Sequence, residues 1–199
     1  MSTRNLTLIV ILAVVLLLGG CGCSSYNGLI GVDQSVKNAS GNVEAQYQRR
    51  TDLYGSVIKT IEGSANFEKS TLKEVIAARA QATSVHISAD SLTPENLAKF
   101  QAAQSQFQSS FSRLMAVAEA YPDIKTTKAF QDFQTQIEGT ENRINVARQD
   151  FNSTVNTYNL KVKTFPNNIF AGFFHFSEKP YFKAEPGSDK APDVKFDIK

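Results

Sequence analysis

Residues 97–121 read LAKFQAAQSQFQSSFSRLMAVAEAY, and this stretch decides the fold class. Its seam positions recur at alternating steps of three and four, at Leu97, Phe100, Gln104, Phe107, Phe111, Leu114, Ala118 and Tyr121. Such spacing keeps one seam of a helix facing a partner for about seven turns, and only packing of helix on helix uses it. The stretch therefore predicts an all-α protein.

The residues on either side of this stretch predict where the helix begins and ends. Thr93-Pro94-Glu95 combines an N-cap threonine, a proline at the first helical position and an acid near the positive end of the helix dipole. Pro122 removes a backbone donor and clashes with the preceding turn. We therefore expect a helix over about residues 94–120.

Three other segments carry the same spacing, over about residues 31–61, 64–87 and 125–163. The first contains Gly41 and Gly55, each of which costs about 1 kcal/mol relative to alanine. Four amphipathic helices with short connections pack most simply as an antiparallel up-and-down four-helix bundle. The sequence predicts such a bundle over residues 31–163.

The N-terminal residues differ in kind from the rest of the chain. Arg4 is followed by a nearly unbroken apolar run from Leu6 to Leu18, which predicts an export signal or membrane segment over residues 1–20. The sequence Leu18-Gly19-Gly20-Cys21 resembles a bacterial lipobox, so the signal would be cut before Cys21 and the Cys21 thiol would carry lipid. The alternative keeps residues 6–24 as an uncleaved helix. In both cases residues 21–30 form an anchor and linker.

Charge and cysteine usage define the environment of the body. Because the charge ahead of the apolar run is positive, we expect the body on the extracytoplasmic side of a bacterial membrane, periplasmic or at the cell surface. The net charge is +2, and no run of Lys and Arg is interleaved with aromatics, so no nucleic-acid partner is expected. Cys23 is the only cysteine besides Cys21, so a disulfide framework in the body is excluded.

Residues 164–199 form an aromatic tail that we expect to be irregular and to pack at the membrane-proximal end of the bundle. An up-and-down bundle of four helices returns its last C-terminus to the end where the first helix began. The candidates for membrane contact are Phe170, Phe173, Phe174 and Phe176. The favoured interpretation, however, is that these rings fold back and plug the open end of the bundle, and entry of some of them into the headgroup layer is the alternative.

No catalytic, cofactor-binding or metal-binding constellation is visible. A di-metal carboxylate site would need inward Glu-x-x-His pairs on two helices, and the sequence has none. His86 and His175 are isolated, so each is expected to be a surface or packing residue. We therefore expect a protein that is not an enzyme.

Charged residues on the apolar seams are the unusual feature. Arg50, Arg79 and Glu141 interrupt three seams, and counting residues from one end places them at one level with Gln104. They predict a polar layer in which Glu141 accepts from Arg79 or Arg50 and Gln104 fills the remaining valence. The alternative is that these side chains reach out to solvent at the edge of the seam, as Arg148 would also do.

Several motifs, in order along the chain, resemble those of the LemA family. They are YNGL at 26–29, QYQRRTDL at 46–53, AAR at 77–79, EAYPDIK at 119–125, GTENRI at 139–144, and VNTYN with FP between Val155 and Pro166. The departures are local: LYGSV stands at 53–57 where members commonly carry Leu-Ile-Pro-Asn-Leu, and the first helix has no tryptophan. Members usually keep an uncleaved N-terminal helix.

This resemblance implies a membrane-anchored helical domain facing away from the cytoplasm, with a mirror-type four-helix bundle and no established enzymatic activity. It supplies no catalytic residues. We therefore expect a scaffold or protein-interaction module of the cell envelope with an unidentified envelope protein as partner; its oligomeric state stays open. The alternative function is a membrane-surface module whose Phe-rich tail binds or remodels lipid.

Overall fold

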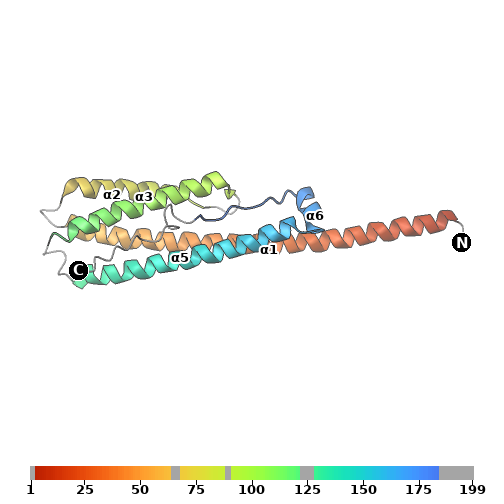
Figure 1. Cartoon of the computed structure of the whole chain (residues 1–199), viewed down its shortest axis with the longest axis horizontal. Helices are drawn as coiled ribbons and strands as arrows, with labels where there is room; N and C mark the ends of the chain where they lie inside the picture. The colour runs from red at the N-terminus through yellow and green to blue at the C-terminus, as the bar shows by residue number, and fades with distance from the viewer. Residues whose placement is uncertain (1–2, 64–67, 88–90, 122–127, 184–199) are drawn as a thin grey trace, which may run out of the picture.

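The computed structural model describes residues 3–63, 68–87, 91–121 and 128–183, and every regular element among them is helical (Figure 1). The elements are α1 (Thr3–Glu62), α2 (Lys69–Ser84), α3 (Pro94–Ala118), α5 (Lys128–Lys163) and α6 (Asn167–Phe173). The all-α prediction is therefore confirmed. The expected break at Pro122, the start of a helix at 125, and the charged end of the tail at 184–199 lie outside the described residues.

Local sequence sets the start of α3 as expected. The Thr93 hydroxyl accepts from the backbone N–H of Asn96 at 3.1 Å, and Pro94 occupies the first helical turn. Glu95 lies in the same turn, where its charge favours the positive end of the helix dipole. The N-cap prediction is confirmed.

Helix α1 is longer than the helix predicted over about residues 31–61. It runs without interruption from Thr3 to Glu62. The chain stays helical through Gly19 and Gly20 and through the expected linker at 21–30. Each glycine costs about 1 kcal/mol in a helix, but Ser25 and Leu29 are already buried against other elements. Packing on the C-terminal side therefore holds this segment helical.

Among the described residues, α1 alone contains a window long and apolar enough to cross a membrane. None of this 18-residue window is buried inside the protein. The exposed apolar segment and the packed segment are thus two parts of one continuous helix.

The remaining helices pack along the C-terminal two thirds of α1 (Figure 1). Helix α5 lies beside α1 and runs in the opposite direction, while α2 and α3 form a second antiparallel pair. The N-terminal part of α1 projects beyond all of them.

Two apolar clusters fill the space between the helices. One joins α1, α2, α3 and α5 around Tyr54, Val75, Phe107 and Phe130. The other joins α1, α3 and α5 around Tyr47, Phe100 and Phe151, and it is completed by Ala171 and Phe182 from the segment after α5. The segment after α5 therefore supplies core residues to this second cluster, to which α2 contributes none.

The tail differs from expectation in two respects. Part of it is helical, because Asn167–Phe173 forms α6. Beyond α6 the chain extends back along α5 until Phe182 packs on Phe151, with ring centroids 5.0 Å apart. The prediction of an irregular tail is therefore wrong for residues 167–173. Helix α6 lies at the end of the body nearest the apolar segment, where Phe170 contacts Gly22. Residues 179–182 return along α5, because Asn159 and Asn152 bind their backbone.

Candidate functional site

The centre of the body contains a buried arginine with a set of polar partners. The Arg50 side chain of α1 is 1% exposed. Its Nη2 donates to Oε1 of Gln104 at 2.6 Å and to the Gln104 backbone carbonyl at 3.2 Å, and its Nη1 donates to Oε1 of Glu141 at 3.4 Å. Residues from α1, α3 and α5 are therefore joined at one level of the body.

Tyr54, one turn after Arg50, completes this polar layer. Its hydroxyl donates to Oε1 of Glu141 at 2.9 Å, and its ring stacks on Phe111 with centroids 3.6 Å apart. Burial raises the pKa of the Tyr54 phenol, and the neighbouring Glu141 carboxylate raises it further. Tyr54 is thus held as a neutral donor to a carboxylate that also faces Arg50.

The structure brings together three of the four residues expected in this layer, Arg50, Gln104 and Glu141, and leaves out the fourth. Arg79 of α2 is half-buried and lies against α1 at Gly55, where an added Cβ would be 2.6 Å from Nη2 of Arg79. The contribution of α2 comes instead from its backbone, because the Ala82 carbonyl accepts from Nε2 of Gln104 at 3.2 Å. The missing side chain of Gly55 gives the Arg79 guanidinium a place on α1 away from the layer.

The alternative, in which these charged side chains reach out to solvent, describes none of the three layer residues fully. Arg50 is buried, whereas the Glu141 side chain keeps 25% of its surface exposed. Arg148 does leave the seam, and its Nη2 donates to the backbone carbonyl of Lys183 in the tail at 2.7 Å. Its guanidinium also lies over the Phe182 ring, 5.5 Å from the centroid.

A pair of asparagines on α5 holds the tail in place, and sequence reasoning missed both. Asn152 accepts from the backbone N–H of Phe182 at 2.8 Å and donates to its carbonyl at 3.0 Å. Asn159 makes the same pair of bonds with Lys179, at 2.8 and 2.9 Å. Their spacing of seven residues places them on one face of α5, which was the signal available in the sequence.

Two further contacts fasten the same segment. The hydroxyl of Tyr158 donates to the Ser177 carbonyl at 3.0 Å, and Nζ of Lys179 lies 2.9 Å from Oδ1 of Asp33 on α1. Burial, with a smaller contribution from the Asp33 charge, raises the pKa of Tyr158 to about 12. The tyrosine therefore stays a hydrogen-bond donor well above neutral pH.

The four aromatic residues that the sequence offers as candidates for membrane contact do not form one surface. The Phe170 ring lies over Gly22 of α1, Phe174 lies 4.7 Å from the Tyr26 ring by centroids, and Phe176 is half-buried. Of the four, Phe173 is largely exposed, at 75%. The exposed apolar face of α6 consists instead of Ile169 and Phe173, spaced by four residues, and Phe165 is exposed in the turn before α6.

The cysteines and histidines lie apart from the polar layer. Cys21 and Cys23 are both free and exposed on α1. Nδ1 of His86 lies 2.8 Å from Oε1 of Glu44, and His175 occupies the turn after α6 with a φ of 61°. Within the described part of the chain, no three His, Cys, Asp or Glu side chains are grouped so that they could hold a metal ion.

Comparison with known proteins gives consistent matches. The model of the LemA family matches residues 39–196. Magnetosome protein MamQ 2 of Paramagnetospirillum magneticum is 26% identical over 185 residues, covering 82% of this chain and 66% of that protein. Protein LemA of Metamycoplasma hominis is 28% identical over 145 residues, covering 73% of this chain and 63% of that protein. The chain thus spans just under two thirds of the length of these relatives.

The polar layer predicts a stability loss on removal of its carboxylate. Glu141→Ala leaves the buried Arg50 guanidinium without a counter-charge and the Tyr54 hydroxyl without its acceptor. Because Glu141 is partly exposed, we expect the lower end of the cost of breaking a buried pair, about 3 kcal/mol, in the free energy of unfolding. Chemical denaturation followed by circular dichroism measures it. Glu138→Ala, exposed one turn earlier on α5, is the matched control, and equal stability of the two variants would contradict the layer.

The asparagine pair predicts release of the tail without unfolding of the helices. Asn152→Ala with Asn159→Ala removes four hydrogen bonds, each worth about 1 kcal/mol. We expect hydrogen exchange of residues 176–183 to accelerate more than about tenfold, while α1 and α5 keep their protection. Asn145→Ala, exposed on the same helix, serves as the control. Unchanged protection of the tail in the double variant would show that other contacts hold it.

Proposed function

This chain belongs to the LemA family, and from that premise we propose that it is a membrane-anchored, non-enzymatic scaffold or protein-interaction module of the bacterial cell envelope. The observation that carries the proposal is the continuity of α1. One helix contains an exposed apolar segment and, further along, the seam on which the other helices pack. A partner bound to the body would therefore be held at a set distance from the membrane.

The dimensions of α1 support a role as a spacer. Packing begins near Ser25, and α1 ends at Glu62. At 1.5 Å per residue this portion is about 57 Å long. In our proposal the four long helices form an antiparallel up-and-down bundle of the mirror type, and the opposite directions of successive helices support it (Figure 1).

The proposal places the body outside the cytoplasm. Arg4 precedes the apolar run, and positive residues favour the cytoplasmic side of a membrane helix. The anchor is either lipid on Cys21 after cleavage or the uncleaved helix. The exposed position of Cys21 leaves its thiol open to acylation, and the unbroken helix through Gly20 supports a spanning segment. Lipidation of Cys21 stays a prediction that the intact mass of the purified protein decides.

Binding rather than catalysis is favoured by how the buried polar groups are used. Arg50, Gln104, Glu141 and Tyr54 are directed at one another and at backbone carbonyls. A buried ion pair of this kind has its best-attested use in setting the register of helices. We therefore assign the layer to the architecture of the body and the partner-binding role to its outer surface.

Site-specific photo-crosslinking in intact cells tests the scaffold proposal. Ile76 on α2 and Val146 on α5 are large aliphatic residues that are 41% and 49% exposed on different helices. With a photo-reactive residue at each position, a specific partner gives a discrete adduct at one position and not at the other. Background labelling at both positions, or the same ladder of adducts at both, would contradict a defined interface.

A second candidate function is a membrane-surface module whose tail binds lipid. The exposed apolar face of α6, Ile169 and Phe173, favours it because α6 packs on α1 at Gly22, close to the end of the apolar run. Four residues of helix separate Leu18 from Gly22, a rise of about 6 Å. This face therefore lies at headgroup level when the apolar run spans a bilayer.

Tryptophan fluorescence distinguishes this candidate, because the chain has no native tryptophan. The full chain with Phe173→Trp is reconstituted in vesicles that contain lipids brominated on their acyl chains. We expect blue-shifted emission that the bromines quench if the α6 face enters the boundary between headgroups and acyl chains. Val146→Trp, exposed on the body, is the matched control and should not be quenched. Equal quenching of the two variants would count against lipid contact by the tail.

A further inference from the structure

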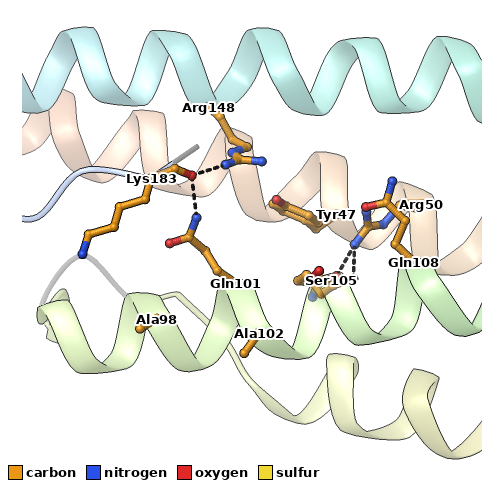
Figure 2. A pocket seen from close by; sticks show the side chains of 10 residues that line it. Tyr47, Arg50, Ala98, Gln101, Ala102, Ser105, Gln108, Arg148 and Lys183 are labelled. Atoms are coloured by element: carbon orange, nitrogen blue, oxygen red, sulfur yellow. Dashed lines mark hydrogen bonds between the residues drawn. The ribbon is translucent and has the colours of Figure 1, made fainter. Parts of the chain in front are cut away.

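A cavity of about 320 Å³ lies next to the polar layer, between α1, α3 and α5, and it is bounded on one side by the tail at Lys183 (Figure 2). This volume falls at the lower end of the range for small-molecule sites. The side chains of Tyr47, Gln101, Gln108 and Arg148 converge on the space from three helices.

The lining is positively charged. Arg50 and Arg148 both belong to it, and Lys183 stands at its edge. Within the described residues, the ion pairs of the structure include no carboxylate paired with Arg148. In the described part of the chain, Arg50 pairs with Glu141, whose Oε1 is 3.4 Å from Nη1 of Arg50 and also accepts from Tyr54. Positive charge therefore exceeds negative charge around the cavity.

Arg50 also lines the cavity, but its guanidinium is already used by the polar layer. It lies over the Tyr47 ring, 4.8 Å from the centroid, and its Nε is buried, so a ligand in the cavity does not reach that atom. Arg148 is therefore the cationic group of the lining that a ligand can meet, because it is half-buried and has no carboxylate partner among the ion pairs of the described residues.

The rest of the lining is apolar or neutral. Tyr47 presents its ring, and Ala98 and Ala102 lie one turn apart on α3. Both alanines are exposed, so they line the cavity where it meets solvent. Gln101 donates to the Lys183 carbonyl, so the tail forms part of the wall. A ligand therefore meets cationic and amide donors at one side and an aromatic or aliphatic surface at the other.

We propose that this cavity binds a small amphipathic carboxylate, with the carboxylate toward Arg148 and the apolar body against Tyr47 and the two alanines. Guanidinium groups match the planar fork of a carboxylate. Because Arg148 and Gln101 also bind the Lys183 carbonyl, the site is complete only when the tail is docked. The inference is independent of which partner or membrane the body meets.

The test uses the full chain in lipid nanodiscs, with alanine methyl groups labelled with carbon-13, and 3-phenylpropionate as the probe. We expect saturable shifts of the Ala98 and Ala102 methyl resonances and none at Ala116, farther along α3. The neutral amide of the same acid should bind about tenfold more weakly or worse, because it forfeits the charge-assisted hydrogen bonds. Absence of saturable shifts at Ala98 and Ala102 would overturn the site.

Two variants test separately the charge of Arg148 and the volume of the cavity. Arg148→Gln should lower the affinity for the acid at least about tenfold and remove the preference over the amide. Arg143→Gln, which removes the same charge from an exposed position of α5, should leave both unchanged. Ala102→Phe fills the mouth from an exposed position without changing charge and should abolish binding of both probes. Equal affinity of the Arg148 and Arg143 variants, or equal binding of acid and amide by the unaltered chain, would refute recognition of a carboxylate.

Discussion

The structure depends on the continuity of one helix, α1, which carries an exposed apolar segment and then the seam on which the body packs. An α-helix satisfies its backbone hydrogen bonds internally, so the apolar segment needs no partner for its backbone. The same helix continues as the longest element of the body, where Leu29, Val36, Val43 and Tyr54 are buried. Because α5 and α6 pack directly on it, the orientation of the body is tied to that of the apolar segment. Five glycines from residue 19 to residue 31 are tolerated since packing begins as early as Ser25.

The polar layer adds specificity to a core that is otherwise apolar. Seams of Phe, Leu, Val and Tyr can slide past one another at modest cost, whereas a buried guanidinium tolerates few arrangements. Arg50 meets α3 through both the side chain and the carbonyl of Gln104, and it meets α5 through Glu141. Gln104 then reaches the backbone of α2 at Ala82. Four helices are thereby placed in one register by a few polar side chains.

The tail is also fixed in position by polar groups, but through its backbone and not through a buried charge. An extended backbone brings its own N–H and C=O groups, and these need partners when they lie on a helix. Asn152 and Asn159 provide a donor and an acceptor each, as a neighbouring strand would. Phe182 then covers Phe151, and Lys183 becomes part of the cavity wall next to Arg148. The segment that the sequence suggests as an aromatic plug thus also forms one wall of the cavity, at Lys183.

Local sequence determines much of this structure. The spacing of apolar residues by three and four, the Thr93 cap and the apolar run after Arg4 determined the helices and the exposed apolar part of α1, because helix periodicity and capping act over a few residues. Counting along the predicted helices also brought Arg50, Gln104 and Glu141 to one level. Tertiary structure alone decided that Arg79 lies over Gly55 and not in the layer, and that the tail returns along α5. It also decided that Arg148 faces a cavity. Those outcomes depend on which side chains meet across helices far apart in the chain, and no periodicity within one segment carries that information.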